Sequence, residues 1–326
     1  MWTTPQPLLL PRKAGEKVGM RSSKIIKVQE KITWLDFLNP THEDIEQIKK
    51  IGNFHPIVLA ELLRPSAHPK AEVYDGYIFF SYHLPLYDDA SKVSAKGEID
   101  FVIAKDHVIT VHYQPLAMLD EFTEKVKNNA EFKSLVLGEN TGKFVYYLLD
   151  AINDFCLRQL AHIEENLGVV NRHIFSNQEH LMLQHISYVK RDILNYFIIV
   201  EPQTALLHSF KESGINFWGE EMRIYLANLV NAHFKIARQI ENYRDAIESL
   251  EETNSQLLNS KTNAVMQRFT ILAFLTFPLA LFTAIYNVPE AGQTLDNLFG
   301  NFWNSFLAMS ILTISVLMVF IKKEWF

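Results

Sequence analysis

The chain has 326 residues, 48% of them apolar, and a formal net charge of −6 at pH 7. This length allows about two domains with a core of ordinary size, and the acidic balance, with no basic stripe, argues against nucleic acid as a partner. A single cysteine, Cys156, excludes an intrachain disulfide and suits a reducing compartment.

The first third of the chain predicts a polar N-terminal segment at 1–30 and a small α/β domain at 31–115. Asn39-Pro40-Thr41 marks the start of a helix that places Ile45 and Ile48 on one face. Two stretches rich in β-branched and aromatic residues then predict strands. These are 73–82 and 99–112, the second divided by a turn at Lys105-Asp106-His107. We therefore expect a small sheet covered by helices.

From residue 116 the pattern becomes helical, and we expect a helical cytoplasmic stalk over 116–265. The sequence at 138–142 predicts one break. Glu201-Pro202 predicts another, because proline disfavours helix at the residue before it. Two long helices are expected between these breaks, at 143–173 and 179–200.

A further helix is predicted from Trp218 to Tyr286, because after Gly214 the chain has no proline until Pro278. Its apolar residues follow alternating steps of three and four, which is the pattern of a coiled-coil seam. At about 1.5 Å per residue this helix would be roughly 100 Å long. We expect it to connect the water-facing domain to the membrane.

Two apolar stretches near the C-terminus, at 269–286 and 302–321, contain no Asp, Glu, Lys or Arg. Each is long enough to cross a bilayer as a helix. We therefore place the first transmembrane helix at 266–286 and the second at 302–321. An external loop at 287–301 joins them, and 322–326 forms a cytoplasmic tail.

The basic residues near these spans predict their orientation. Lys261 and Arg268 precede the first span, Lys322 and Lys323 follow the second, and the loop between the spans has no Lys or Arg. Because cytoplasmic flanks carry the excess of Lys and Arg, both termini should be cytoplasmic in a multi-pass protein of the cell inner membrane.

The heptad pattern continues through the first span and predicts which residues face an axis. One row holds Asn263, Thr270, Phe277 and Ala284, and the other holds Met266, Ala273, Ala280 and Asn287. Polar residues are costly in lipid and small residues permit close approach, so these rows should face water or a partner helix. The pattern fits a pore or a packed seam without a channel, and it does not fix the number of subunits.

The run from Tyr243 to Glu290 resembles the membrane-proximal helix of the CorA family of divalent-cation transporters. The resemblance covers nearly the whole chain from about residue 31. Further blocks match in the same order: Asn39-Pro40-Thr41, His55-Pro56, Glu72-Val73-Tyr74-Asp75-Gly76-Tyr77, Ile109-Thr110-Val111-His112 and Lys322-Lys323-Glu324-Trp325-Phe326.

This resemblance implies a funnel-shaped homopentamer with an α+β cytoplasmic domain, a long helical stalk and two transmembrane helices per subunit. The first membrane helices would line the pore. Matched positions give Asn263, Thr270, Phe277, Ala280, Ala284 and Asn287 as pore-lining residues, with Phe277 as the gate. Asn287 would bind the hydrated cation. The transported ion would be Mg²⁺ by default, with Zn²⁺, Co²⁺ or Ni²⁺ as alternatives, and no other cofactor is expected.

The chain departs from the family at its signature, Gly-Met-Asn directly after a tyrosine. Here Tyr286 is followed by Asn287-Val288-Pro289, so the Gly-Met pair is absent. Mg²⁺ dehydrates reluctantly, and a ring of asparagine oxygens would bind its water shell. An alternative function is therefore a non-conducting membrane-anchored scaffold or sensor that keeps the fold without a selectivity filter. No Ser/His/Asp or Cys/His arrangement supports an enzyme.

Overall fold

The computed structural model describes residues 24–27, 32–88, 91–175 and 179–322. The chain divides into two compact units. The first comprises Met1–Asn171 and His185–Glu248, and the second comprises Arg172–Gln184 and Ser249–Phe326. Most of the predicted N-terminal segment, and the tail beyond Lys322, lie outside the described residues.

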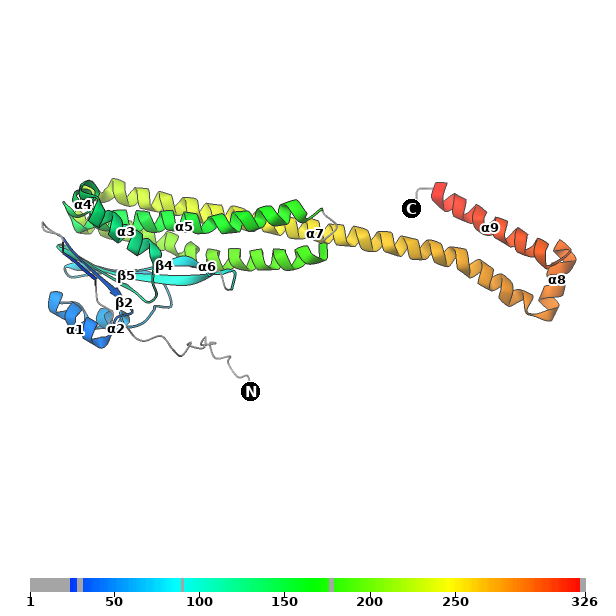
Figure 1. The fold of residues 1–326 in the computed structure, drawn as a ribbon, viewed down its shortest axis with the longest axis horizontal. Coiled ribbons are helices and arrows are strands. Elements are labelled where there is room, and N and C mark those ends of the chain that lie inside the picture. The colour runs from blue at the N-terminus through cyan, green and yellow to red at the C-terminus, as the bar shows by residue number, and fades with distance from the viewer. Residues whose placement is uncertain (1–23, 28–31, 89–90, 176–178, 323–326) are drawn as a thin grey trace. The chain divides into compact units, whose positions relative to one another are not determined.

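The first unit contains a mixed sheet (Figure 1). Its strand order is β1-β2-β6-β5-β4-β3. Neighbouring strands are antiparallel except β2 and β6, which are parallel. The strands are β1 (Lys24–Lys27), β2 (Thr33–Leu38), β3 (Lys70–Tyr74), β4 (Tyr77–Asp88), β5 (Val93–Ala104) and β6 (His107–His112). The sheet thus includes a strand within the segment 1–30, upstream of the boundary expected at residue 31.

The turn expected between two strands at Lys105-Asp106-His107 is confirmed as the β5–β6 connection. The stretch 73–82, expected as strand, instead contains the β3–β4 hairpin, in which Tyr74 pairs with Tyr77 across a two-residue turn. Gly76 has φ +83° there. A tight hairpin turn requires positive φ, which glycine adopts without steric cost, so Asp75-Gly76 divides the stretch into two strands.

Helices α1 (His42–Ile51) and α2 (Pro56–Glu61) cover one face of this sheet. Thr41 caps α1 as predicted, in a reciprocal arrangement with Asp44. Ile45 and Ile48 are buried as the predicted helical face required. They share a core with Val58 and Leu62 of α2 and with sheet residues that include Leu35, Phe79, Val102 and Ile109.

The opposite face of the sheet packs against longer helices through aromatic side chains. These helices are α3 (Ala117–Asn128), α5 (Thr141–His173) and α6 (Glu179–Trp218), and the short helix α4 (Ala130–Leu137) packs on α3. Trp34 of β2 lies 5.1 Å from Phe144 of α5, between ring centroids, and Phe80 of β4 lies 4.4 Å from Phe210 of α6. The sheet is therefore covered by helices on both faces, as the α/β pattern predicted.

The break expected at Glu201-Pro202 is wrong, because α6 continues through Pro202 to Trp218. Proline removes one hydrogen bond, the one to the carbonyl of Ile198. Ile198 is 66% exposed, so water can satisfy that carbonyl. The buried neighbours Ile199 and Val200 hold the helix in place on its other side.

The chain turns between α6 and the next helix at Gly219, which has φ +106°. A short 3₁₀ turn, Glu220–Met222, follows, and α7 then runs without interruption over Arg223–Tyr286. The long helix expected from Trp218 therefore begins a few residues later, because positive φ at Gly219 ends α6 at Trp218.

The second unit contains the C-terminal part of α7, then α8 (Pro289–Phe299) and α9 (Phe302–Lys322). The connection 287–301, expected as a loop, is therefore mostly helical. Pro289 occupies the first helical position and Glu290 lies in the first turn, two features that favour a helix start.

Candidate functional site

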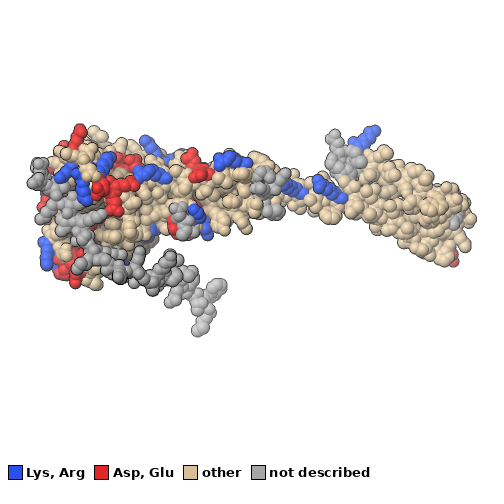
Figure 2. Space-filling view, in the orientation of Figure 1, with Lys and Arg blue, Asp and Glu red and all other residues tan. Residues whose placement is uncertain are grey.

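Helix α7 carries the first stretch expected to cross a membrane. Among the described residues, Glu220–Tyr286 is the helical segment found long and apolar enough to span a bilayer. The visible surface of its C-terminal part, with α8 and α9, is almost free of charged side chains (Figure 2). The described part of α9 supplies a shorter apolar stretch, Phe302–Ser315, so the second span stays a prediction.

Helix α9 packs on one face of α7 through aromatic side chains. Phe282 is only 5% exposed, and its ring centroid lies 5.9 Å from that of Phe302 and 6.1 Å from that of Phe306. Tyr286 contacts the same Phe302 ring at 4.8 Å. This face of α7 is therefore occupied within the single chain.

The residues predicted to line a pore lie on the side of α7 that faces away from Phe282. At about 100° of rotation per residue, they fall on the opposite half of the helix. All are exposed in the single chain: Asn263, Thr270, Phe277, Ala280, Ala284 and Asn287. The sequence thus places them on one face of one helix, away from the packing with α9.

The polar groups of this face are oriented by α7 itself. The Thr270 hydroxyl donates to the carbonyl of Met266 at 2.9 Å. Asn287 closes the last turn, because its backbone N–H and its Nδ2 both donate to the carbonyl of Thr283, at 3.1 and 2.9 Å. The amide nitrogen of Asn287 is thereby turned toward the helix, which leaves its Oδ1 as the atom offered to another partner.

Phe277 lies in the middle part of the predicted face and is 69% exposed. A bulky apolar side chain in this position has no neighbour among the described residues that buries it. A gate built from copies of one residue requires such a projecting ring, so its exposure is compatible with the predicted role.

Sequence reasoning missed two buried polar connections in the first unit, since neither has a short motif. In the first, His233 of α7 joins β4 to α6. Its Nδ1 lies 3.2 Å from the Tyr82 hydroxyl, and its Nε2 lies 3.1 Å from the carbonyl of Val200. Burial lowers the pKa of His233 to about 4, so the ring is neutral at pH 7. A neutral ring that donates from Nε2 and accepts at Nδ1 satisfies both partners.

The second connection is a buried acidic pair on β5. Asp100 and Glu98 are 2% and 3% exposed. The Tyr113 hydroxyl donates to Asp100 at 2.7 Å, and the Ser66 N–H donates to Glu98 at 2.7 Å. Burial, and then the charge of Glu98, raises the pKa of Asp100 to about 7. Burial also acts to raise the pKa of Glu98, but hydrogen bonds from His83 and Ser66 outweigh it and lower that pKa.

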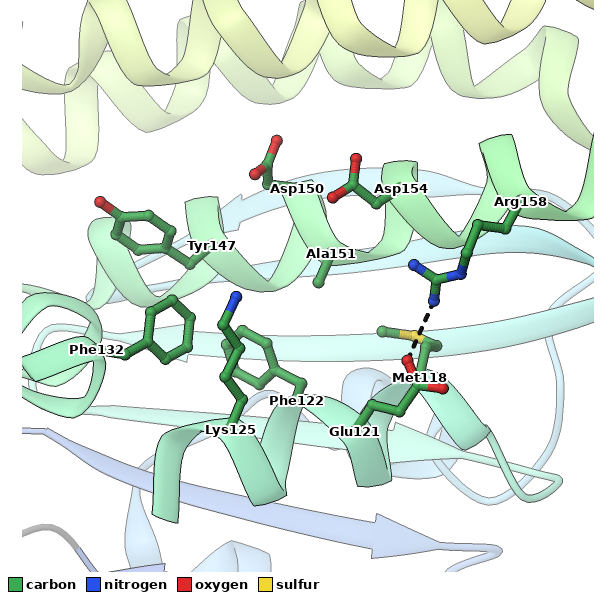
Figure 3. A pocket seen from close by; sticks show the side chains of 10 residues that line it. All are labelled: Met118, Glu121, Phe122, Lys125, Phe132, Tyr147, Asp150, Ala151, Asp154 and Arg158. Atoms are coloured by element: carbon green, nitrogen blue, oxygen red, sulfur yellow. Dashed lines mark hydrogen bonds and ion pairs between the residues drawn. The ribbon is translucent and has the colours of Figure 1, made fainter. Parts of the chain in front are cut away.

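A pocket of about 290 Å³ lies between α3, α4 and α5. Arg158 at its edge pairs with Glu121 at 3.2 Å. Figure 3 shows the carboxylates of Asp150 and Asp154 turned away from Lys125, which occupies the space between α3 and α5. Within the described ranges, no group of three or more His, Cys, Asp or Glu is placed to hold a metal ion. The pocket therefore adds no metal centre to the face of α7.

Comparison with known proteins finds a family and solved structures that resemble this chain. The profile of the family described as CorA-like Mg²⁺ transporter protein matches residues 29–323. The cobalt/magnesium transport protein CorA of Thermotoga maritima is 21% identical over 301 residues, which cover 90% of this chain and 83% of the relative.

Two solved structures from Methanocaldococcus jannaschii share the fold. The complete CorA magnesium transporter superposes with a TM-score of 0.77 at 17% identity, covering 92% of this chain and 94% of that chain. The soluble domain of the same transporter gives a TM-score of 0.61 at 15% identity, covering 69% of this chain and 88% of that chain. The family is one of membrane metal-ion transporters and not of enzymes. Because its profile spans most of the sequence, this chain belongs to the CorA family of Mg²⁺ transporters.

Proposed function

We propose that this chain assembles into a homopentameric channel that passes divalent cations across the cell inner membrane, with Mg²⁺ as the default ion. The observation that carries the proposal is the exposed face of α7, on which Asn263, Thr270, Phe277, Ala280, Ala284 and Asn287 lie opposite the contact with α9. An apolar helix with polar and small residues on one face needs water or other helices against that face.

Copies of the chain would satisfy this requirement by placing the exposed faces around a common axis. Because α9 packs on the far side of α7, it would form an outer ring of second spans in contact with lipid. Lys261, Arg268 and Lys322 would lie at the cytoplasmic surface, in keeping with the preference of basic flanks for that side. Helix α8 would lie on the external side of the membrane, and both termini of the chain would lie in the cytoplasm.

The chemistry of the face suits a hydrated divalent cation. Asn287 would contribute one amide oxygen per subunit at the outer mouth, and amide oxygens accept hydrogen bonds from the waters that Mg²⁺ retains. Phe277 would form an apolar constriction that stops ions by dewetting. An inside-negative potential would favour entry by about 2.3 kcal/mol per charge per 100 mV. Zn²⁺, Co²⁺ and Ni²⁺ are alternative cargo, because the Gly-Met pair is absent before Asn287.

The test is ion flux into liposomes that contain the purified protein, with Mg²⁺, Zn²⁺ and Co²⁺ measured separately. We expect Asn287→Ala to change the ratio of the ion fluxes and Phe277→Ala to raise flux at rest. Leu272→Ala is the matched control, because Leu272 is 55% exposed and lies outside the predicted rows. Native mass spectrometry of the same samples should give five subunits.

Flux that is ion-selective and altered by the first two substitutions, but not by the control, would support the channel. An assembled protein that passes none of the three ions over a range of potentials would overturn it. In that case the residues of the exposed face serve packing, and the non-conducting scaffold or sensor becomes the better account.

A further inference from the structure

Gly292 in the first half of α8 is buried and lies against the end of α7. A β-carbon placed on Gly292 would be 2.9 Å from the carbonyl oxygen of Tyr286, a separation that real β-carbons essentially never show. The N–H of Gly292 donates to the carbonyl of Val288 at 2.8 Å, so the residue belongs to the first helical turn of α8. Its close approach is therefore to the backbone of another helix.

Helix propensity alone does not explain a glycine at this position. Glycine in a helix interior costs up to about 1 kcal/mol relative to alanine. Gly292 has no positive φ that would require glycine. The close contact with the Tyr286 carbonyl means that a side chain at this position requires the backbone around it to shift.

The contact is one residue away from the predicted filter. Tyr286 directly precedes Asn287, whose backbone N–H and Nδ2 both bond to Thr283. A β-carbon at position 292 would push the Tyr286 carbonyl or α8 aside. Because carbonyl 286 and N–H 287 belong to one planar peptide unit, such a shift would reorient the Asn287 backbone and side chain.

We propose that Gly292 is a positioning residue that sets ion selectivity by seating α8 against the end of α7 and so fixing the direction of the Asn287 amide oxygen. This inference rests on the proposed function. Gly292, which lies in α8, would be the glycine that allows two backbone segments to approach closely at the outer mouth. It also explains how a chain that has Asn-Val-Pro after Tyr286 can present an asparagine in a defined orientation.

The experiment compares Gly292→Ala, Asn287→Ala and the double variant in liposomes, with Gln293→Ala as control. Gln293 is the next residue of α8 and is exposed. We expect Gly292→Ala to assemble normally and to change the Mg²⁺/Co²⁺ flux ratio by about threefold or more. In the Asn287→Ala background, Gly292→Ala should add nothing, because its effect passes through Asn287. Gln293→Ala should behave as wild type.

A second readout does not depend on conduction. The thiol of an Asn287→Cys variant can be labelled with a charged thiol reagent, and the native Cys156 is buried and should react slowly. We expect Gly292→Ala to change the labelling rate at position 287 several-fold, and Gln293→Ala to leave it unchanged.

The outcomes separate the two proposals. If wild-type protein passes no ions, the channel function is contradicted. The labelling rates at position 287 then still test whether Gly292 positions that residue. Wild-type flux with an unchanged ion ratio and unchanged labelling in Gly292→Ala overturns the positioning role alone. So does an effect that is fully additive in the Asn287→Ala background, or a Gly292→Ala protein that fails to assemble, because either result gives Gly292 a role independent of Asn287.

Discussion

The two units of this chain differ in how far their large apolar residues are buried and in which partners their polar groups bond to. In the first unit, large apolar residues such as Trp34 and Phe144 are buried, and buried polar groups find partners on other elements, as His233 does on β4 and α6. In the second, Phe277 is 69% exposed, and hydroxyls such as that of Thr270 bond back to their own helix.

This difference indicates that the two units need different surroundings. A surface with many large exposed apolar residues is stable only against lipid or other subunits. Hydroxyls that bond within their own helix leave no donor unsatisfied in an apolar surrounding. The first unit contains a large buried apolar core, whereas most of the large apolar residues of the second have no cover within the single chain.

The largest expected effect is on the buried connections of the first unit. His233→Ala leaves the Tyr82 hydroxyl and the Val200 carbonyl without their buried partner, which should lower the free energy of unfolding by roughly 3 kcal/mol. Chemical denaturation in detergent, followed by tryptophan fluorescence, measures this. His208→Ala is the control, because His208 is exposed on α6 and its loss should have little effect. Equal effects of the two substitutions would contradict the stabilising role of the buried His233 connection in the first unit.

A smaller effect is expected in the second unit. Phe282→Ala removes the ring that α9 contacts and should destabilise the α7–α9 pair by about 2 kcal/mol, less than a comparable change in a soluble core, because lipid is itself apolar. Unfolding in increasing fractions of denaturing detergent measures the change. Leu272→Ala, at a 55% exposed position, should cost well under half as much. If Leu272→Ala were the more damaging, the face of α7 that packs on α9 would be wrongly assigned.

The smallest effect concerns pH. Asp100 has a folded-state pKa of about 7, raised by burial and by Glu98 above its ordinary value near 3.9. The folded state therefore binds the proton more tightly, and stability should fall as pH rises from about 4 to about 7. We expect Asp100→Asn to remove at least ~1 kcal/mol of this decrease, measured by denaturation at each pH.

The difference in slope between wild type and Asp100→Asn isolates this group, because other histidines and acids titrate in both proteins. Asp75→Asn provides the control, since Asp75 is exposed in the β3–β4 turn. Parallel slopes in wild type and Asp100→Asn would show that the buried acidic pair holds no proton near neutral pH.

Local sequence signals predicted the elements that depend on local physics. The cap at Thr41, the turn after Ala104 and the apolar stretch of α7 all follow from residues within one or two turns. Pro202 was misleading because tertiary packing holds α6 together across it. The sequence does not predict α8, because its start signals, Pro289 and Glu290, are short and follow Tyr286 directly, and the same residues also occur in loops.

The candidate site likewise has one part that local sequence predicts and another part that depends on tertiary structure. Heptad spacing was sufficient to place Asn263, Thr270 and Phe277 on one side of a helix, and the structure leaves that side exposed. The bonding of Asn287 to Thr283 and the contact of Gly292 with Tyr286 depend on how the chain reverses after α7. Spacing along the sequence carries no information on that reversal. The buried pair of Asp100 and Glu98 was likewise invisible, since exposed acidic residues follow the same pattern.

The contact between Tyr82 of β4 and His233 of α7 also affects how the chain folds while it is being synthesised. All six strands of the sheet are made by His112, but His233 follows Tyr82 by 151 residues. The 121 residues between His112 and His233 would take a ribosome roughly 6 to 24 s at about 5–20 residues per second. During that time the sheet face that carries Phe80 and Tyr82 lacks its final cover. Chaperone binding to the nascent chain should therefore be strongest between the completion of β6 and the emergence of α7.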